Sequence, residues 1–148
     1  MKKLSHVDKR GNARMVDVSA KPVQFREAVA RGSITLKRAT LALISKNRIA
    51  KGDVLNTARI AGIQAAKRTA DLIPLCHPLS LTHIDVDLHL KRDRIDIVAT
   101  ARIAAQTGVE MEALTAVAVA ALTIHDMCKA VDNEMVIGEI QVVSKTKR

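Results

Sequence analysis

The chain has 148 residues, a formal net charge of +9, and hydrophobic residues at 48% of its positions. This length is about one ordinary domain, which folds without help from a disulfide framework or a metal. We interpret residues 1–148 as a single domain whose basic ends, about 1–12 and 145–148, are flexible. The sequence has no apolar run near the length of a membrane span and no apolar core like a signal peptide's. We therefore expect a cytoplasmic protein without a membrane partner.

The positive charge calls for anionic partners, and nucleic acid is the first class to consider. Aromatic residues, however, make up 1% of the chain, with Phe25 as the single phenylalanine and no Trp or Tyr. The sequence therefore lacks a stacking platform for single-stranded nucleic acid, and it contains no RGG, RNP or finger motif. We therefore expect no nucleic-acid partner. A nucleoside triphosphate is a small polyanion that fits the positive charge as well.

The first predicted elements are a strand and two helices. Ile34 and Leu36 alternate with polar residues, which predicts a strand over 33–37, and a helix is predicted over 38–47. A longer helix is predicted over 51–73, with an aspartate as its N-cap and a proline after its end. Small residues on this helix form a ridge that lets another element approach closely: Ala58, Ala61, Gly62, Ala65 and Ala66.

A hairpin, a long helix and a last strand are predicted next. Apolar and polar residues alternate over 83–90 and again over 95–103, and the sequence KRDR separates the two runs. The segment 109–131 has no helix breaker and is apolar almost all round, which predicts a long buried helix. The sequence MVIGEIQVV predicts the final strand.

This order of elements predicts the fold class. It is typical of the split βαβ, or ferredoxin-like, sandwich, an α/β (α+β) fold with helices on one face of an antiparallel sheet. A helix as apolar as 109–131 is poorly covered by a single sheet. We therefore expect another subunit to bury part of it.

The long helix carries charged residues that are candidates for chemistry. Asp126 and Lys129 are three residues apart near its end, so their side chains project from neighbouring positions. Such a pair acts as base and acid where burial and neighbours tune the two pKa values, or it forms a structural ion pair. Glu110 and Glu112 lie in the first turn, where the helix dipole stabilises carboxylates and capping is the simple explanation.

The spacing of Glu112 and Asp126 favours a site shared between subunits. The fourteen positions between them place the two side chains within about 40° of each other around the helix, but roughly 21 Å apart along it. One helix therefore cannot bring both to the same small reacting centre. If two copies pair antiparallel about a symmetry axis, the Glu112 end of one meets the Asp126 end of the other. We hypothesise composite sites at a subunit interface.

Several cations flank the start of the helix predicted over 51–73. Lys51 precedes a glycine and the N-cap, and Arg59, Lys67 and Arg68 follow on the helix. Free helix N–H groups, a glycine and cations together can bind phosphate. The pattern is weak, because it is neither a Walker loop nor GxGxxG, and lysines on a helix often form a solvated face.

The stretch LIPLCHPLSL places Cys76 and His77 side by side between two prolines. Adjacent extended residues point to opposite sides, so this pair rarely ligates one metal or works as a nucleophile with its base. His125 and Cys128, at helical spacing, keep a zinc site open as an alternative. Because prolines stiffen the segment, we interpret Leu75, Cys76 and His77 as a wall of a binding pocket in which His77 forms hydrogen bonds.

Four stretches closely resemble the MoaC family of molybdenum cofactor biosynthesis: MVDVSAK, KGDVLNTARIAGIQAAKRTADLIPLCHPL, TGVEMEALTAVAVAALTIHDMCKAV and MVIG. The resemblance covers almost the whole chain, and the combination of LIPLCHPL, GVEMEALTA and DMCKAV is very specific. It implies a ferredoxin-like subunit in a homohexamer, a trimer of dimers, with active sites at subunit interfaces. The implied reaction is that of a lyase that converts (8S)-3',8-cyclo-7,8-dihydroguanosine 5'-triphosphate into cyclic pyranopterin monophosphate and releases pyrophosphate. A radical SAM partner makes this substrate from GTP.

The resemblance also implies roles for individual residues. Asp126 and Lys129 would be the acid/base pair, while Lys51 and Lys67 would meet the triphosphate or the purine. The substrate pocket would be lined by Leu75, Cys76, His77, Glu110, Met111 and Glu112. No cofactor or metal is implied, except for Mg²⁺ as a companion of the triphosphate. A basic nucleic-acid module and a zinc-stabilised structural protein remain the rival interpretations.

The residue types suit the implied reaction. Opening a purine imidazole ring and building a pterin require several proton transfers, for which closely set Asp, Lys, His and Glu groups are appropriate. Cyclising the phosphate expels an anion, and nearby cations stabilise such a leaving group. The excess of positive charge and the scarcity of aromatic residues agree with this chemistry.

Overall fold

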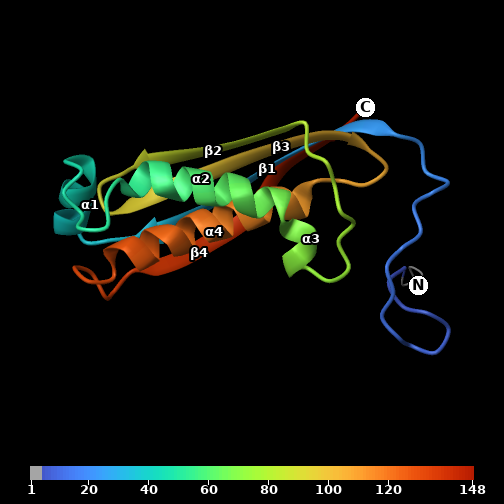
Figure 1. Cartoon of the computed structure of the whole chain (residues 1–148), viewed down its shortest axis with the longest axis horizontal. Coiled ribbons are helices and arrows are strands. Elements are labelled where there is room, and N and C mark those ends of the chain that lie inside the picture. Colours follow the sequence, from blue (N-terminus) through green and yellow to red (C-terminus); the bar gives the residue numbers. More distant parts are fainter. Residues whose placement is uncertain (1–4) are drawn as a thin grey trace.

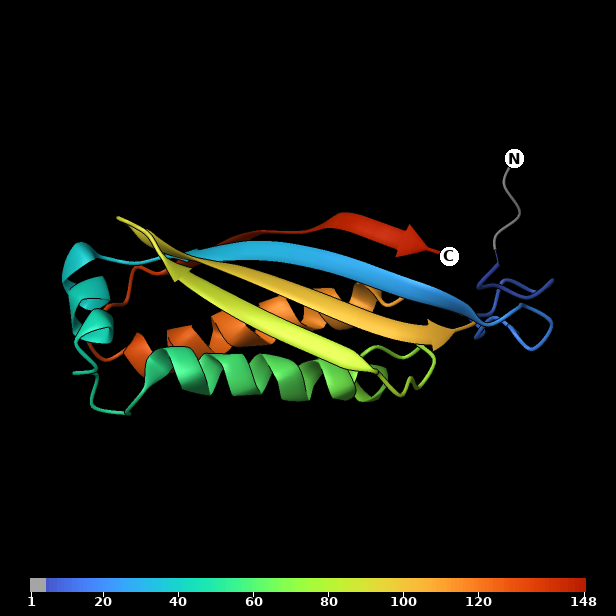
Figure 2. The same ribbon diagram turned by 90° about the horizontal axis from the view of Figure 1, so that it is seen from above.

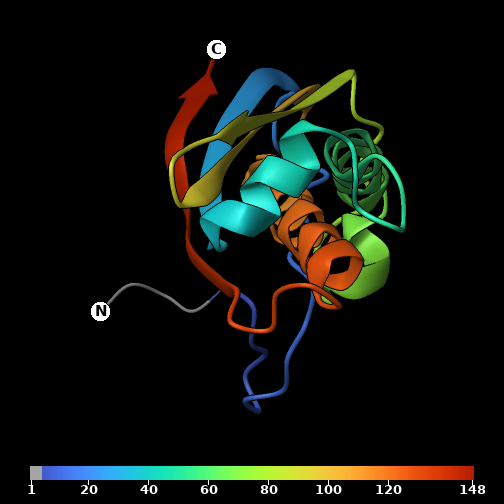
Figure 3. The same cartoon turned by 90° about the vertical axis from the view of Figure 1, so that its left-hand side faces the viewer.

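The computed structural model describes residues 5–148 as one antiparallel four-stranded sheet with helices on one side (Figure 1). The elements are β1 (Gln24–Thr35), α1 (Arg38–Ser45), α2 (Val54–Lys67), α3 (Thr69–Leu72), β2 (His83–Leu90), β3 (Arg94–Ala105), α4 (Glu110–Cys128) and β4 (Val136–Lys147). The strands are ordered β2-β3-β1-β4, and α2 and α4 run along one face of the sheet (Figure 2). Seen from the end, these form two layers, with α1 beside the end of the sheet (Figure 3). The predicted ferredoxin-like α+β arrangement is confirmed.

β1 is the strand that differs most from its prediction. It begins at Gln24, far before the expected segment 33–37, and it pairs with β3 along its whole length. The first part of β1 buries small side chains, Ala28 and Ala30, so this part of the sequence lacks the alternation of large apolar residues that marks a strand. A Cβ on Gly32 would lie 2.8 Å from Cγ1 of Val117. β1 therefore needs small residues, because α4 lies very close to it.

Both ends of the described part of the chain form backbone hydrogen bonds. β4 continues to Lys147, and the backbones of Phe25 and Arg148 exchange hydrogen bonds of 3.0 and 3.1 Å. Residues 145–148, expected to be flexible, are therefore held against β1, because unpaired backbone groups at a strand edge favour continuation of the ladder. At the other end, residues 5–12 form a turn with a bridge between Val7 and Ala13. Residues 1–4 of the expected flexible segment lie outside the described residues.

The helix predicted over 51–73 is two helices. Its N-cap is confirmed, since the Asp53 carboxylate accepts a hydrogen bond of 3.0 Å from the backbone N–H of Asn56. α2 ends at Lys67, and Arg68 adopts a non-helical backbone before α3 begins. The small-residue ridge is also confirmed, because a Cβ on Gly62 would lie 2.9 Å from the carbonyl oxygen of Ala116. The ridge lets α2 pack directly on the backbone of α4.

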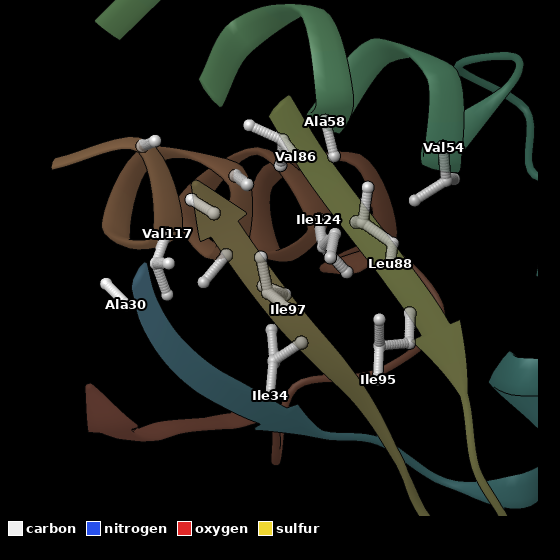
Figure 4. Close-up of a cluster of buried hydrophobic side chains, with 14 of the residues drawn as sticks. Ala30, Ile34, Val54, Ala58, Val86, Leu88, Ile95, Ile97, Val117 and Ile124 are labelled. Atoms are coloured by element: carbon white, nitrogen blue, oxygen red, sulfur yellow. The ribbon is translucent and has the colours of Figure 1, made fainter. Parts of the chain in front are cut away.

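α4 is the central element of the core. By length and composition alone it could cross a membrane, but ten of its 19 residues are buried in the fold. It packs beside α2 and against the sheet, where Val117 and Ile124 meet aliphatic side chains of the strands, including Ile34 and Ile97 (Figure 4). Leu122 on the same helix remains 58% exposed. Cover by another subunit stays a prediction.

A buried carboxylate anchors the end of α4. Asp132 is 2% exposed, and it accepts hydrogen bonds from the backbone N–H of Lys37 (2.8 Å), the hydroxyl of Thr40 (3.0 Å) and the backbone N–H of Glu134 (3.1 Å). Burial alone would raise the pKa of Asp132, but these hydrogen bonds lower it below its ordinary value. The carboxylate thus fixes the end of α4 against the start of α1.

Candidate active site

A hollow of about 290 Å³ lies at the N-terminal end of α4. It is lined by the six residues that the resemblance implied for the substrate pocket: Leu75, Cys76, His77, Glu110, Met111 and Glu112. The first three come from the proline-bounded segment after α3, and the last three from the first turn of α4. Two stretches that are separate in the sequence therefore form one pocket.

His77 forms the hydrogen bond that we expected of it. Its Nε2 lies 2.8 Å from the backbone carbonyl oxygen of Val16. Because a carbonyl oxygen only accepts, Nε2 donates, and in a neutral ring Nδ1 is then left as an acceptor. The N-terminal segment thereby fixes both the orientation and the tautomer of this histidine.

Glu112 and Cys76 both have raised pKa values. Glu112 is 4% exposed, and burial, helped by the nearby charge of Glu110, raises its carboxyl pKa. Burial and then the charge of Glu112 raise the pKa of the Cys76 thiol. Because a thiol is far less nucleophilic than a thiolate, Cys76 is suited to a pocket wall and not to attack. Glu112 is suited to holding a proton.

A second cluster lies at the C-terminal end of α4. The ammonium group of Lys51 donates to Oδ2 of Asp126 at 2.8 Å and to its carbonyl oxygen at 3.0 Å, and the ammonium group of Lys129 lies 2.8 Å from Oδ1. Hydrogen bonds from Lys129 and then Lys51 lower the pKa of Asp126 to about 2. About half of each side chain in this cluster is exposed. The predicted pairing of Asp126 with Lys129 is present, with Lys51 as a third member.

The two clusters lie at opposite ends of the same helix in one subunit. α2 runs antiparallel to α4, so Lys51, just before α2, lies at the Asp126 end (Figure 2). Lys67, the last residue of α2, lies at the opposite end of that helix and does not line the hollow. The residues implied for one active site are therefore divided between two places about 21 Å apart.

The comparisons with known proteins agree with this arrangement of motifs. Residues 15–148 match the MoaC family. The chain belongs to the MoaC family. A cyclic pyranopterin monophosphate synthase of Parvibaculum lavamentivorans is 57% identical over 98% of this chain and 92% of its own length. A protein of the same name from Roseiflexus sp. (strain RS-1) is 59% identical over 99% of this chain and 94% of its own. Cyclic pyranopterin monophosphate synthase 1 of Mycobacterium tuberculosis is 58% identical over 97% and 85%.

The structure of this MoaC-family chain adds polar residues that our sequence reasoning missed. Hollows of about 200 and 530 Å³ adjoin the pocket, and four cationic residues line them or the pocket: Lys21, Arg26, Lys145 and Lys147. Within residues 5–148, Nε of Arg26 and Oγ1 of Thr107 are buried without a hydrogen-bond partner. Lys21 belongs to the recognisable stretch MVDVSAK, whereas the two C-terminal lysines were assigned to a flexible tail.

His125 and Cys128, which kept a zinc site open as an alternative, both lie on α4. Within the described part of the chain, no group of three or more His, Cys, Asp or Glu side chains is arranged to hold a metal ion. Cys128 is fully buried in the core, and burial raises the pKa of its thiol to about 11. Zinc binds the thiolate, so Cys128 is better explained as a packing residue.

Proposed function

We propose that this MoaC-family protein is a cyclic pyranopterin monophosphate synthase, a lyase of molybdenum cofactor biosynthesis. Its substrate is (8S)-3',8-cyclo-7,8-dihydroguanosine 5'-triphosphate, and its products are cyclic pyranopterin monophosphate and pyrophosphate. The observation that carries the proposal is the convergence of LIPLCHPL and GVEMEA on one hollow. Relatives that bear this enzyme name and are 57–59% identical over almost the full chain support it.

The cations beside the pocket suit the triphosphate. Arg26 and Lys147 line both neighbouring hollows, and Lys21 lines the pocket and the larger of the two. Guanidinium and ammonium groups bind phosphate oxygens, and they stabilise the negative charge that develops on a departing pyrophosphate. The phosphate chain would therefore extend from the pocket toward β1 and β4, which supply Arg26 and Lys147.

The carboxylates suit the proton transfers of ring opening and ring closure. Glu112, whose raised pKa makes its carboxyl easier to protonate than an exposed glutamate, would donate a proton, while Asp126 is ionised beside two ammonium groups. Lys129 completes an acid/base pair with Asp126. A general acid at one end of α4 and a charged pair at the other would serve the same substrate if two subunits share a site.

We infer a homohexamer, a trimer of dimers, in which α4 pairs antiparallel with its symmetry mate. The Asp126 end of one subunit then closes the Glu112 hollow of the other. Exposed apolar side chains on and after α4 support this assembly, among them Leu122, Val131 and Val136. Such side chains are costly in water and mark surfaces that other chains cover.

Further features of the cellular role follow from the same proposal. A radical SAM enzyme supplies the substrate from GTP, and the reaction takes place in the cytoplasm. The protein needs no cofactor of its own, and Mg²⁺ accompanies only the triphosphate. Nucleic acid and membranes are not partners.

The test is anaerobic incubation of the protein with the cyclised dihydroguanosine triphosphate, with pterin and pyrophosphate measured over time. Wild type should turn over, and Asp126→Asn should be slower by about 10² to 10⁴, the usual contribution of general acid–base catalysis. Asp93→Asn is the matched control, because it neutralises an exposed, paired carboxylate in the β2–β3 turn. A well-folded hexameric wild type without turnover would refute the proposal.

A further inference from the structure

The N-terminal hairpin, residues 6–14, folds back on itself before the chain reaches the pocket. The backbone N–H of Arg14 donates to the carbonyl oxygen of His6 at 2.9 Å, and that of Asp8 donates to the carbonyl oxygen of Asn12 at 2.9 Å. Val7 and Ala13 form a bridge between its two arms. The segment therefore has a definite conformation of its own, although it lies outside the sheet (Figure 1).

The Asp8 carboxylate organises the turn of this hairpin. Oδ1 accepts hydrogen bonds from the backbone N–H groups of Arg10 (2.8 Å) and Asn12 (2.9 Å), and Oδ2 accepts one from Nδ2 of Asn12 (3.1 Å). Gly11 supplies the positive φ of +82° that the turn requires. Hydrogen bonds from Asn12 lower the pKa of Asp8, so the group stays ionised and keeps these contacts at neutral pH.

The hairpin brings a second histidine to the pocket. His6 lines the same hollow as His77, Glu110 and Glu112, and within residues 5–148 its imidazole has no hydrogen-bond partner. The chain just after the hairpin is held at the pocket by the contact of 2.8 Å between the Val16 carbonyl oxygen and His77. The hairpin that carries His6 is thus tied to the pocket through the segment that follows it.

We propose that the N-terminal hairpin is a lid that delivers His6 to the phosphate end of the bound substrate, where an imidazole N–H donates to a phosphate oxygen. His6 is a substrate-binding residue, and Asp8 is a positioning residue that acts through it. The lid rests on the proposed function, because it assumes a substrate with a triphosphate. Lys21, which follows in the same segment and lines the same hollow, gives this wall of the pocket its cationic character.

Steady-state kinetics test the lid. His6→Ala should raise KM roughly tenfold with a much smaller change in kcat, because a hydrogen bond to a charged group is lost. Asp8→Ala should raise KM by less, and the double variant should be no worse than His6→Ala alone, since Asp8 acts through His6. Asp8→Asn, whose amide oxygen still accepts from the backbone of Asn12, should recover most of the affinity. Lys9→Ala is the control, because it removes an exposed cation from the same hairpin.

Two results would overturn the lid while leaving the proposed enzyme intact. One is an unchanged KM in His6→Ala, and the other is a loss confined to kcat, which would place His6 in proton transfer. Hydrogen exchange supplies a test that needs no turnover. Inorganic tripolyphosphate should slow exchange of the Asn12 and Arg14 amides in wild type and Lys9→Ala but not in His6→Ala. Equal exchange in all three proteins would also refute the lid, even if the proposed reaction were absent.

Discussion

The pKa values of the carboxyl groups at the two ends of α4 are shifted in opposite directions. Glu112 is almost fully buried, and within the described residues it has no ion pair, so its pKa is raised. Asp126 is exposed between the ammonium groups of Lys51 and Lys129, and its pKa is lowered to about 2. One helix thus carries a carboxyl group that keeps its proton to a higher pH than usual and a second carboxyl group that loses its proton at a lower pH than usual. A reaction that needs both must bring two helix ends together, which a single subunit does not do.

The largest effect on turnover is expected when the carboxylates at the two ends of α4 are neutralised in separate variants and the two variants are then assembled into mixed oligomers. Glu112→Gln and Asp126→Asn should each reduce turnover at least about 100-fold. If each site takes one end from each subunit, random co-assembly of equal amounts leaves about a quarter of the sites with both native ends. Turnover by the mixture should therefore recover to roughly a quarter of wild type.

Co-expression of the two variants with different affinity tags gives the mixed oligomers for this measurement. The control is a mixture made by combining the finished oligomers, which should stay inactive as long as subunits do not exchange. If properly mixed oligomers were inactive, Glu112 and Asp126 would not act together across a subunit interface. The proposed shared site would then be wrong.

The next largest effect concerns the anchor of the Asp126 end. Asp132→Asn preserves the shape of the side chain. In either orientation of the new amide, however, its NH₂ group faces a backbone N–H, that of Lys37 or that of Glu134, which donates to the carboxylate in the wild type. Loss of these buried hydrogen bonds should destabilise the protein by about 2–4 kcal/mol, which lowers Tm by roughly 5–15 °C. Glu134→Gln, which removes an exposed ion pair of 3.6 Å, should cost little.

The stability of Asp132→Asn should also respond differently to pH. Because the folded pKa of Asp132 is below its unfolded value, its stabilising contribution is complete above about pH 4 and is lost as the pH falls through the folded pKa. Wild type should therefore lose more stability than the variant between neutral pH and about pH 3. Equal losses in thermal melts across this range would show that the carboxylate charge is irrelevant.

A smaller effect should follow from removing one cation at the Asp126 end. Lys51→Met deletes two contacts to Asp126, so the carboxyl pKa should rise from about 2 toward its ordinary value, with Lys129 still holding it down. Carbon-13 NMR titration of the side-chain carboxyl measures this directly. Lys46→Met removes an exposed lysine from the same loop and should leave the titration unchanged. A pKa still near 2 in Lys51→Met would mean that Lys129 alone sets the charge state.

The smallest effect should appear at the Glu112 end, in the reactivity of Cys76. Burial is the main reason for the raised pKa of this thiol, and the Glu112 charge is the second. Glu112→Gln should therefore speed alkylation by iodoacetamide at pH 8 by less than about threefold. Cys128 should react in neither protein until it unfolds, because it is fully buried. Mass spectrometry of each cysteine gives the two rates, and slower labelling of Cys76 in the variant would contradict the prediction.

The sequence predicted those parts of the fold whose periodicity reflects burial. Apolar and polar residues alternate regularly in β2 and β3 because one face of the sheet meets the core. The sequence of α4 predicts a buried helix because most of its circumference is apolar and packs against other elements. β1 was mostly missed for the opposite reason. It lies so close to α4 that Ala28, Ala30 and Gly32 must be small, and such residues give no periodic signal.

The candidate site was predicted in its motifs but not in its surroundings. LIPLCHPL and the start of α4 were assigned to one pocket, and the structure brings them together. The contributions of Lys21 and Arg26 depend on how the N-terminal segment and β1 pass the pocket, which no local pattern encodes. The role of Asp132 was also missed, because only the tertiary fold shows its three hydrogen-bond donors.

The contact between α2 and α4 limits how this protein can vary. A side chain added at Gly62 would lie 2.9 Å from the backbone oxygen of Ala116, and Ala58, Ala66 and Ala120 are fully buried or nearly so. A backbone oxygen cannot turn aside as a flexible side chain can. In a saturation mutagenesis library, Gly62 should accept almost no replacement, and the neighbouring alanines should accept only glycine, serine or cysteine. The outer face of α2 should vary more freely, so tolerance to substitution should follow a helical period along this segment.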